Sequence, residues 1–205
     1  MKRSLAIVFI GLLSLQPGMG KNKLQIGLIP SENIDKEAIH LAVKKIEGYF
    51  NAKVVLTKRP ELPKKFEKDT INVNALIQYF ENELLLLNDK NIYLTDQGIA
   101  LNDNASYSVR GLAKLGGRIG VVSTLVVKHE AKTKREYLNL LAKVVVHETA
   151  HLFGLGHCMD DDKCVLVSSL PNPRKFYSAE RMLCRSCLGK IDDKLIRRKY
   201  REPKF

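Results

Sequence analysis

Hydrophobic and polar residues alternate along the first half of the chain in blocks that predict strands and helices in turn. Short apolar runs at Leu24–Ile29, Ala52–Thr57 and Asn91–Thr95 are bounded by proline or polar residues and predict three strands. Between them, apolar residues recur at helical spacing over Ile34–Ile46 and Asn74–Leu87, which predicts two amphipathic helices. This order of strands and helices predicts an α/β fold in which neighbouring strands are parallel.

The second half of the chain begins regularly and then becomes irregular. A β-rich run at Arg118–Val127 predicts a further strand, and the charged residues 128–135 predict an exposed loop. A helical pattern resumes at about Glu136, whereas few long apolar patterns follow Gly154. We expect Ser31 to cap the first helix, and we expect the regular and irregular parts to form one domain with a cleft between them.

Residues 1–20 differ in character from the rest of the chain. Lys2 and Arg3 precede an uncharged apolar run at Leu5–Leu15, and small residues follow it, which is the order found in a secretory signal peptide. The run is shorter than the roughly 20 residues of a membrane-spanning helix, and the alternative is an uncleaved anchor or an apolar first helix. We expect residues 21–205 to form a single domain that is secreted or periplasmic after cleavage, and otherwise cytoplasmic or membrane-anchored.

Composition excludes several classes of protein. The 205 residues are 45% apolar and 27% charged, which is typical of a globular domain and not of a collagen, a repeat array or a disordered chain. The formal net charge of +12 can attract nucleic acid, acidic polymers or anionic lipid. A dense basic stretch near the C-terminus is interpreted as a solvated tail. It consists of Lys194, Arg197, Arg198, Lys199, Arg201 and Lys204.

The chemistry of the chain is concentrated in the run His147-Glu148-x-x-His151-x-x-Gly154-x-x-His157. Two histidines four residues apart lie on one face of a helix, so both imidazoles can reach one metal ion. Glu148 is rotated by about 100° around the helix, which suits a group that contacts metal-bound water rather than the metal. Gly154 allows a sharp turn that returns His157 as a third ligand. Three histidines and one open position are the arrangement of a catalytic zinc site.

All four cysteines follow this run, at Cys158, Cys164, Cys184 and Cys187. Two closely spaced pairs favour a tetrahedral structural zinc ion in the segment 158–187. The alternatives are two disulfides, which export would favour, or free buried thiols. We expect the two remaining histidines, His40 and His129, to lie at the surface.

The combined pattern resembles the archaemetzincin family of metzincin-type zinc metalloproteases. The signature of that family is H-E-x-x-H-x-x-G-x-x-H-C, then C-x-M, then C-x-x-C. Here the first part runs from His147 to Cys158, the second begins at Cys164, and the third is Cys184 to Cys187. The resemblance is close from Asn91 onward and holds in outline before it.

The resemblance implies an α/β (α+β) fold, a metzincin-like zincin domain with a twisted, mostly parallel sheet, an active-site helix and an irregular C-terminal part held by zinc. It implies a catalytic zinc ion on the histidines, Glu148 as general base, and a structural zinc ion on the cysteines. It also implies that an edge strand, here Arg118–Thr124, pairs with extended peptide substrate. The implied ligands are His147, His151 and His157 for the catalytic ion and Cys158, Cys164, Cys184 and Cys187 for the structural ion.

The sequence departs from the family pattern at three places. Leu166 stands where the family has the methionine of its Met-turn, a change that keeps an apolar side chain of similar size. Five residues, rather than the usual four, separate Cys158 from Cys164. The leader is the third departure, because known members of the family are mostly intracellular.

These features predict a zinc-dependent metallopeptidase, with two zinc ions per chain, that hydrolyses peptide bonds with zinc-bound water and Glu148 as general base. We expect a monomer that acts on peptides or proteins, with no nucleic-acid partner. The alternatives are a non-catalytic zinc-dependent peptide-binding protein and a basic zinc-module nucleic-acid-binding protein. Retention of Glu148 favours catalysis, because binding alone does not need a base.

Tyr177 is a candidate donor to the oxyanion, and the alternative role for Tyr177 is packing in the core.

Overall fold

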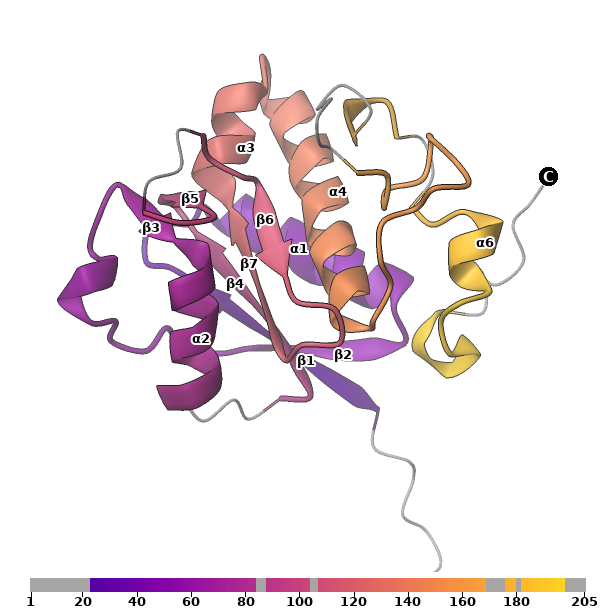
Figure 1. Cartoon of the computed structure of the whole chain (residues 1–205), viewed down its shortest axis with the longest axis horizontal. Helices are drawn as coiled ribbons and strands as arrows, with labels where there is room; N and C mark the ends of the chain where they lie inside the picture. Colours follow the sequence, from indigo (N-terminus) through magenta and orange to yellow (C-terminus); the bar gives the residue numbers. More distant parts are fainter. Residues whose placement is uncertain (1–22, 84–87, 104–106, 169–175, 180–181, 198–205) are drawn as a thin grey trace, which may run out of the picture.

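A computed structural model describes residues 23–83, 88–103, 107–168, 176–179 and 182–197 of the chain. Helices cover both faces of a twisted central sheet, and a loop-rich C-terminal part packs beside them (Figure 1). The strands are β1 (Leu24–Pro30), β2 (Ala52–Leu56), β3 (Thr70–Asn72), β4 (Lys90–Thr95), β5 (Gly98–Ala100), β6 (Gly111–Ala113) and β7 (Ile119–Ser123). The α-helices that lie wholly within the described residues are α1 (Lys36–Tyr49), α2 (Val73–Glu83), α3 (Thr124–Glu130), α4 (Lys134–Leu152) and α6 (Arg185–Leu188).

Five strands form the central sheet in the order β2-β1-β4-β7-β6. The first four strands in this order are parallel to one another, and β6 lies antiparallel to β7 at the edge. Strands β3 and β5 pair in a separate parallel sheet. The mostly parallel sheet confirms the predicted α/β class.

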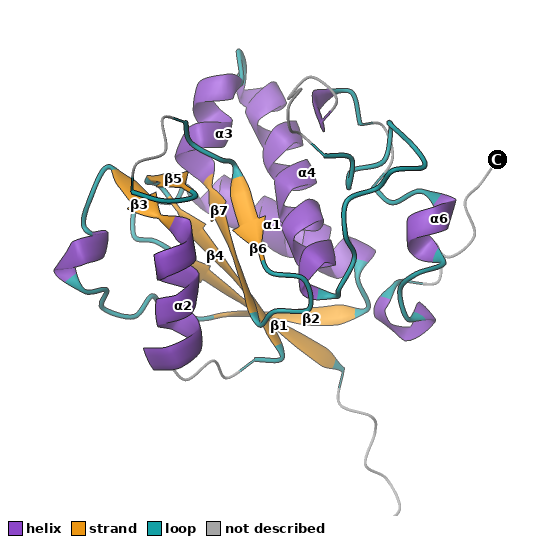
Figure 2. Cartoon of the chain, viewed as in Figure 1, coloured by secondary structure: helices purple, strands orange, loops and turns teal. Residues whose placement is uncertain are grey.

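Helices on the two faces bury both sides of the central strands (Figure 2). Along β4, Ile92 and Leu94 belong to the core shared with α1 and α4, whereas Tyr93 belongs to the core shared with α2. Alternate residues of a strand face opposite sides of its sheet, and a strand covered on both sides therefore reads as a continuous apolar run. This is the physical reason that apolar runs in the sequence predict β1 and β4.

The first helix begins later than the sequence indicates. Asp35, not Ser31, is its N-cap, and the Asp35 carboxylate accepts hydrogen bonds from the backbone N–H groups of Glu37 and Ala38. The Ser31 hydroxyl donates instead to the carboxylate of Asp96, at 2.6 Å. The expectation for Ser31 was wrong because a serine after a strand can bond a neighbouring strand end as readily as a helix.

The predicted strand Arg118–Val127 is also wrong in its second half. Strand β7 ends at Ser123, whose hydroxyl accepts a hydrogen bond from the N–H of Val126 and caps α3. Helix α3 thus replaces the end of the predicted strand and the start of the predicted loop 128–135. Its β-branched residues favour a strand locally, and the capping serine decides against it.

The edge of the sheet is not the strand that the family resemblance implied. Strand β7 lies between β4 and β6, so Arg118–Thr124 is internal and the edge strand is β6. Three residues are too few to show the period-two alternation by which a strand is recognised. The correct edge therefore emerges only from the pairing.

Several predictions concern parts of the chain near its ends. The predicted leader, residues 1–20, lies outside the described residues, as does most of the basic tail. Lys194 is exposed, whereas the Arg197 side chain donates to the backbone carbonyl of Glu47. Among the described residues, no helix combines the length and the apolar character that crossing a membrane requires.

The core shared with α1 and α4, which we call the larger core, also includes residues of the C-terminal part. Among them is a short apolar segment that contains Val165 and Leu166. Leu166 is fully buried, and its carbonyl accepts a hydrogen bond from the N–H of Cys158 at 2.8 Å. The side chain is therefore a packing element beneath the loop that leaves α4.

We predict that Leu166→Met lowers the free energy of unfolding by less than about 1.5 kcal/mol, because the two side chains have similar volumes. Leu166→Ala leaves a cavity and is expected to cost about 2–5 kcal/mol. Urea unfolding of the three zinc-loaded proteins measures both changes. A loss in the methionine variant as large as in the alanine variant would contradict the packing described above.

Candidate metal centre and active-site cleft

Helix α4 carries the first two histidines of the predicted site on one face. His147 Nδ1 lies 2.7 Å from the carbonyl oxygen of Val165, and His151 Nδ1 lies 2.6 Å from that of Leu155. A carbonyl oxygen only accepts, so each Nδ1 carries the proton and each Nε2 holds a lone pair. The two Nε2 atoms face each other at 2.8 Å. Two acceptor nitrogens repel at this distance unless a cation binds both, so this pair fits a metal ion.

The third histidine reaches the same point because the chain turns at Gly154. Gly154 has φ of +85° and ends α4, with its N–H donating to the carbonyl of His151 at 2.8 Å. The ring of His157 then lies 5.4 Å from that of His147 and 5.1 Å from that of His151, measured between centroids. One ligand atom from each ring lies within 4.8 Å of the others. We call His147, His151 and His157 the His site.

Burial keeps these imidazoles neutral. It lowers the pKa of His147 to about 3, with the positive charge that His151 would carry acting in the same direction. Burial also lowers the pKa of His151 and of His157. Neutral imidazole is the form that binds a metal, and three such ligands fit zinc.

Glu148 lies next to the His site but points between α4 and β6. Its side chain is buried, and burial raises its pKa to about 8, while the backbone N–H of Ala113 acts in the opposite direction. Its Oε2 atom has no hydrogen-bond partner among the described residues. A carboxylate with one free oxygen and a raised pKa is suited to take up and release a proton near neutral pH.

A cleft of about 530 Å³ opens over the His site and Glu148. One wall is formed by β6 and the residues before it, and the floor is formed by α4. Two exposed apolar side chains also line it, Tyr107 at 52% and Leu115 at 61% exposure. The lining is mainly apolar and also includes the buried Glu148 carboxyl group and the His site, a combination that is typical of hydrolytic sites.

Sequence reasoning missed Arg110, which lines this cleft. Its guanidinium pairs with Glu130, donates to the Tyr177 hydroxyl at 3.1 Å, and lies over the rings of Phe176 and Tyr177. Burial would lower the pKa of Arg110, but the bonds to Glu130 and Tyr177 outweigh it and raise the pKa. No motif in the sequence signals this cluster, because its members come from three separate segments.

Tyr177, the candidate oxyanion donor, packs against the core and contacts Arg110. Its hydroxyl accepts from Arg110, and its ring packs against the larger core. It is not among the described residues that line the cleft, whereas its neighbour Phe176 is. Lys143, one turn before His147 on α4, donates to the Tyr177 carbonyl at 2.6 Å and holds this segment in place.

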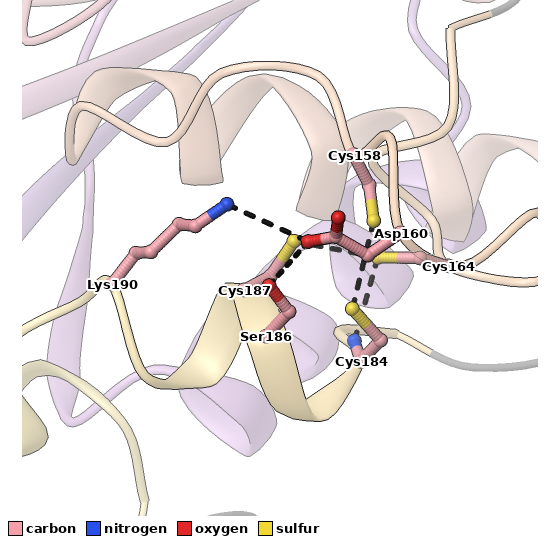
Figure 3. A network of polar contacts seen from close by, with 7 residues as sticks. All are labelled: Cys158, Asp160, Cys164, Cys184, Ser186, Cys187 and Lys190. Atoms are coloured by element: carbon pink, nitrogen blue, oxygen red, sulfur yellow. Dashed lines mark hydrogen bonds and ion pairs between the residues drawn. The ribbon is translucent and has the colours of Figure 1, made fainter.

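The four cysteines form a second cluster, which we call the Cys site. All four are buried and free, with one ligand atom from each within 4.8 Å of the others. Figure 3 shows the thiols of Cys158 and Cys164 facing those of Cys184 and Cys187. The Sγ atoms of Cys158 and Cys184 are 3.6 Å apart, well beyond the roughly 2.05 Å of a disulfide. The geometry therefore fits a tetrahedral ion.

Polar contacts within the Cys site favour one thiolate, and contacts outside it close its outer side. The thiol of Cys187 and the backbone N–H of Cys184 lower the pKa of Cys164. The pKa of Cys187 is raised by the same contact with Cys164, and burial raises that of Cys184. Outside the thiols, the Ser186 hydroxyl donates to the Asp160 carboxylate, and Lys190 lies 3.7 Å from the same carboxylate (Figure 3). These contacts connect the loop after α4 to α6.

The other two histidines, His40 and His129, are both exposed, as the sequence analysis expects. The structure therefore brings together all seven predicted ligands in two clusters, with three histidines in one and four cysteines in the other.

Comparison with known proteins finds one family by sequence and similar folds among solved structures. The model of peptidase family M54 matches residues 20–193. The archaemetzincin of Haloquadratum walsbyi is 27% identical over 175 residues, which covers 79% of this chain and 96% of that protein. The crystal structure of archaemetzincin from Methanopyrus kandleri has a TM-score of 0.68 at 23% identity, covering 82% and 94% of the two chains. That of archaemetzincin from Archaeoglobus fulgidus, complexed with malonate, has a TM-score of 0.67 at 22% identity, covering 82% and 100%.

We predict that Gly154→Ala lowers the free energy of unfolding of the zinc-loaded protein by about 1–2 kcal/mol, because a side chain at positive φ is strained. Gly156→Ala is the matched control. An added Cβ meets nothing within 4 Å at either glycine, but only Gly154 has positive φ. Denaturant unfolding measures both variants, and equal losses would mean that the turn at Gly154 does not depend on its backbone conformation.

Proposed function

Because the chain belongs to peptidase family M54, the family of the archaemetzincins, it is a zinc metallopeptidase, and we propose that the His site and Glu148 form its hydrolytic centre. The observation that carries this proposal is that three imidazoles converge on one mainly apolar cleft, next to a buried carboxylate whose Oε2 atom has no hydrogen-bond partner among the described residues. A peptide-binding protein without catalysis would need the cleft but not a buried carboxylate, whose burial costs stability.

Each residue of the centre has a distinct task in the proposed reaction. His147, His151 and His157 hold the zinc ion, with the first two oriented by the carbonyls of Val165 and Leu155. Zinc, when bound, polarises the peptide carbonyl and lowers the pKa of water to about 7. Glu148 accepts a proton from the attacking water and delivers it to the leaving amine nitrogen.

The open edge of β6 is the proposed binding surface for the peptide backbone. The Arg110 carbonyl accepts from the N–H of Ser123 at 2.8 Å and so faces β7. Backbone groups of successive residues point to opposite sides of a strand, so the N–H and C=O of Gly111 point away from the sheet. An extended peptide can add to this edge as a further strand.

The cleft itself does not carry the strong basic charge of the chain. Its one described arginine, Arg110, is paired with Glu130, and most of the remaining lining is apolar or uncharged. We therefore propose that the cleft accepts uncharged or apolar peptide segments. The alternative of nucleic-acid binding is disfavoured, because the Cys site is buried and Arg197 is bonded to the backbone of Glu47.

We propose that a second zinc ion binds the Cys site, giving two ions per chain. The mutual approach of the four sulfur atoms supports this proposal. Export of residues 21–205 by a cleaved leader remains a proposal that depends on the sequence of residues 1–20. An exported protein could form disulfides with the same sulfurs. Whether the four cysteines are zinc-bound thiolates or disulfides therefore bears on both the second zinc ion and the export.

Glu148→Gln is expected to keep both zinc ions and to lower the rate of peptide hydrolysis by about 10²–10⁴-fold, since general-base help is lost and no ligand is removed. Cleavage of a diverse peptide library, with and without chelator, measures the rate, and metal analysis measures the zinc. Glu61→Gln, at an exposed glutamate, is the control. Cleavage at the wild-type rate by the Glu148 variant would overturn the proposed role of that residue.

Cys184→Ser is expected to remove one zinc ion and to weaken the other, because the Cys site is adjacent in sequence to His157. Metal analysis should give about two ions in the wild type and fewer than two in this variant. Ser186→Ala, which removes the contact to Asp160 but no thiol, should keep both ions. Mass spectrometry showing all four cysteines in disulfides, with one ion on the histidines, would eliminate the second zinc site.

A further inference from the structure

Gly111 occupies a position where the backbone does not require glycine. It lies at the start of β6, and among the described residues only Gly116 and Gly154 have positive φ. Glycine in a strand offers no side chain to pack and loses more freedom on folding than other residues. A strand residue such as valine or threonine would fit this backbone better, so the glycine needs another explanation.

The explanation is the side chain that fills the space in front of it. An ideal Cβ on Gly111 would lie 2.6 Å from Oε1, 2.7 Å from Cγ and 2.8 Å from Cδ of Glu148. Real Cβ atoms essentially never approach another heavy atom closer than 3.0 Å. Glu148 is only 4% exposed, so packed neighbours surround its side chain. The carboxylate can therefore avoid an added Cβ only if these neighbours also move.

Neighbouring positions on the same face of the sheet are also small. Ala113 is two residues along β6, and its register partner on β7 is Gly120. An ideal Cβ on Gly120 would meet the Ala113 Cβ at 3.0 Å and the Glu148 Cβ at only 3.6 Å. The small side chains let α4 lie close to the sheet edge, and Figure 1 shows β6 beside this helix. Of these two glycines, Gly111 is the one at which an added Cβ would meet the carboxyl end of the Glu148 side chain.

We infer that Gly111 is a positioning residue, which acts by leaving room for the Glu148 carboxylate between the edge strand and α4. The inference rests on the proposed role of Glu148 as the base. Any side chain at this position moves either the carboxylate or the edge strand. Movement of the carboxylate changes its distance from the His site, and either movement changes its distance from the peptide held along β6.

A double-mutant cycle tests this inference, with stability as its first readout. Gly111→Ala should destabilise the protein when Glu148 is present. In a Glu148→Ala background the Cγ, Cδ and Oε1 atoms are gone, so the same substitution should cause little or no shift in the unfolding midpoint. Gly120→Ala is the matched control, and its effect should be similar in both backgrounds, because its Cβ meets Ala113 and Ile92 more closely than Glu148.

The second readout is catalysis by the zinc-loaded protein. Gly111→Ala should lower kcat by about 10²-fold with zinc content retained, as expected for a catalytic group displaced by about 1 Å. In the Glu148→Ala background it should lower the residual rate no further. If Gly111→Ala alone fails to fold, recovery of folding in the double variant supports the inference.

Two results would overturn the inference. One is an equal loss of stability from Gly111→Ala with and without the Glu148 side chain, and the other is a Gly111→Ala protein with the wild-type kcat. If the wild type itself cleaves no peptide, the proposed function fails, but the stability cycle still reports whether Gly111 makes room for Glu148. The two failures are therefore distinguishable.

Discussion

The hydrogen bond from His147 to the carbonyl of Val165 is the interaction that connects the His site to the segment of the Cys site. It fixes the tautomer that leaves Nε2 free for zinc, and it fastens the active-site helix to the segment that follows Cys164. Because Val165 lies between a cysteine of one cluster and the buried Leu166, the position of its carbonyl is set by the Cys site and by the core together. Contacts of this kind around metal ligands typically change metal affinity by about 10–100-fold.

A second connection makes the two clusters parts of one unit. Cys158 directly follows His157, and its backbone N–H donates to the carbonyl of Leu166. The loop that returns the third histidine is thus held at its far end by the same segment that orients the first histidine. A small domain with an irregular C-terminal part gains order from such cross-links, since a long loop alone would not hold an imidazole in a fixed place.

The cleft depends on a different constraint, the close approach of α4 to the edge of the sheet. Glu148 occupies the gap between them, and its Oε2 atom has no hydrogen-bond partner among the described residues. A buried carboxyl group of this kind is costly for stability. Proteins accept such costs at sites where the group is used in chemistry. The Arg110 cluster closes one end of the same cleft by joining the residue before β6 to α3 and to the segment of Phe176 and Tyr177.

Local sequence determined the class of fold, the active-site helix and the two sets of ligands. Two histidines four apart on a helix must share a face, and a glycine after them permits the turn, so the His site follows from short-range geometry. The end of β7 at Ser123, the edge strand β6 and the clearance at Gly111 were decided only by tertiary structure. A three-residue strand has too few positions to show a period, and the contact of Gly111 with Glu148 joins segments that are far apart in the chain. Nothing in the sequence near either residue specifies that contact, because it is set by how closely the helix packs against the sheet.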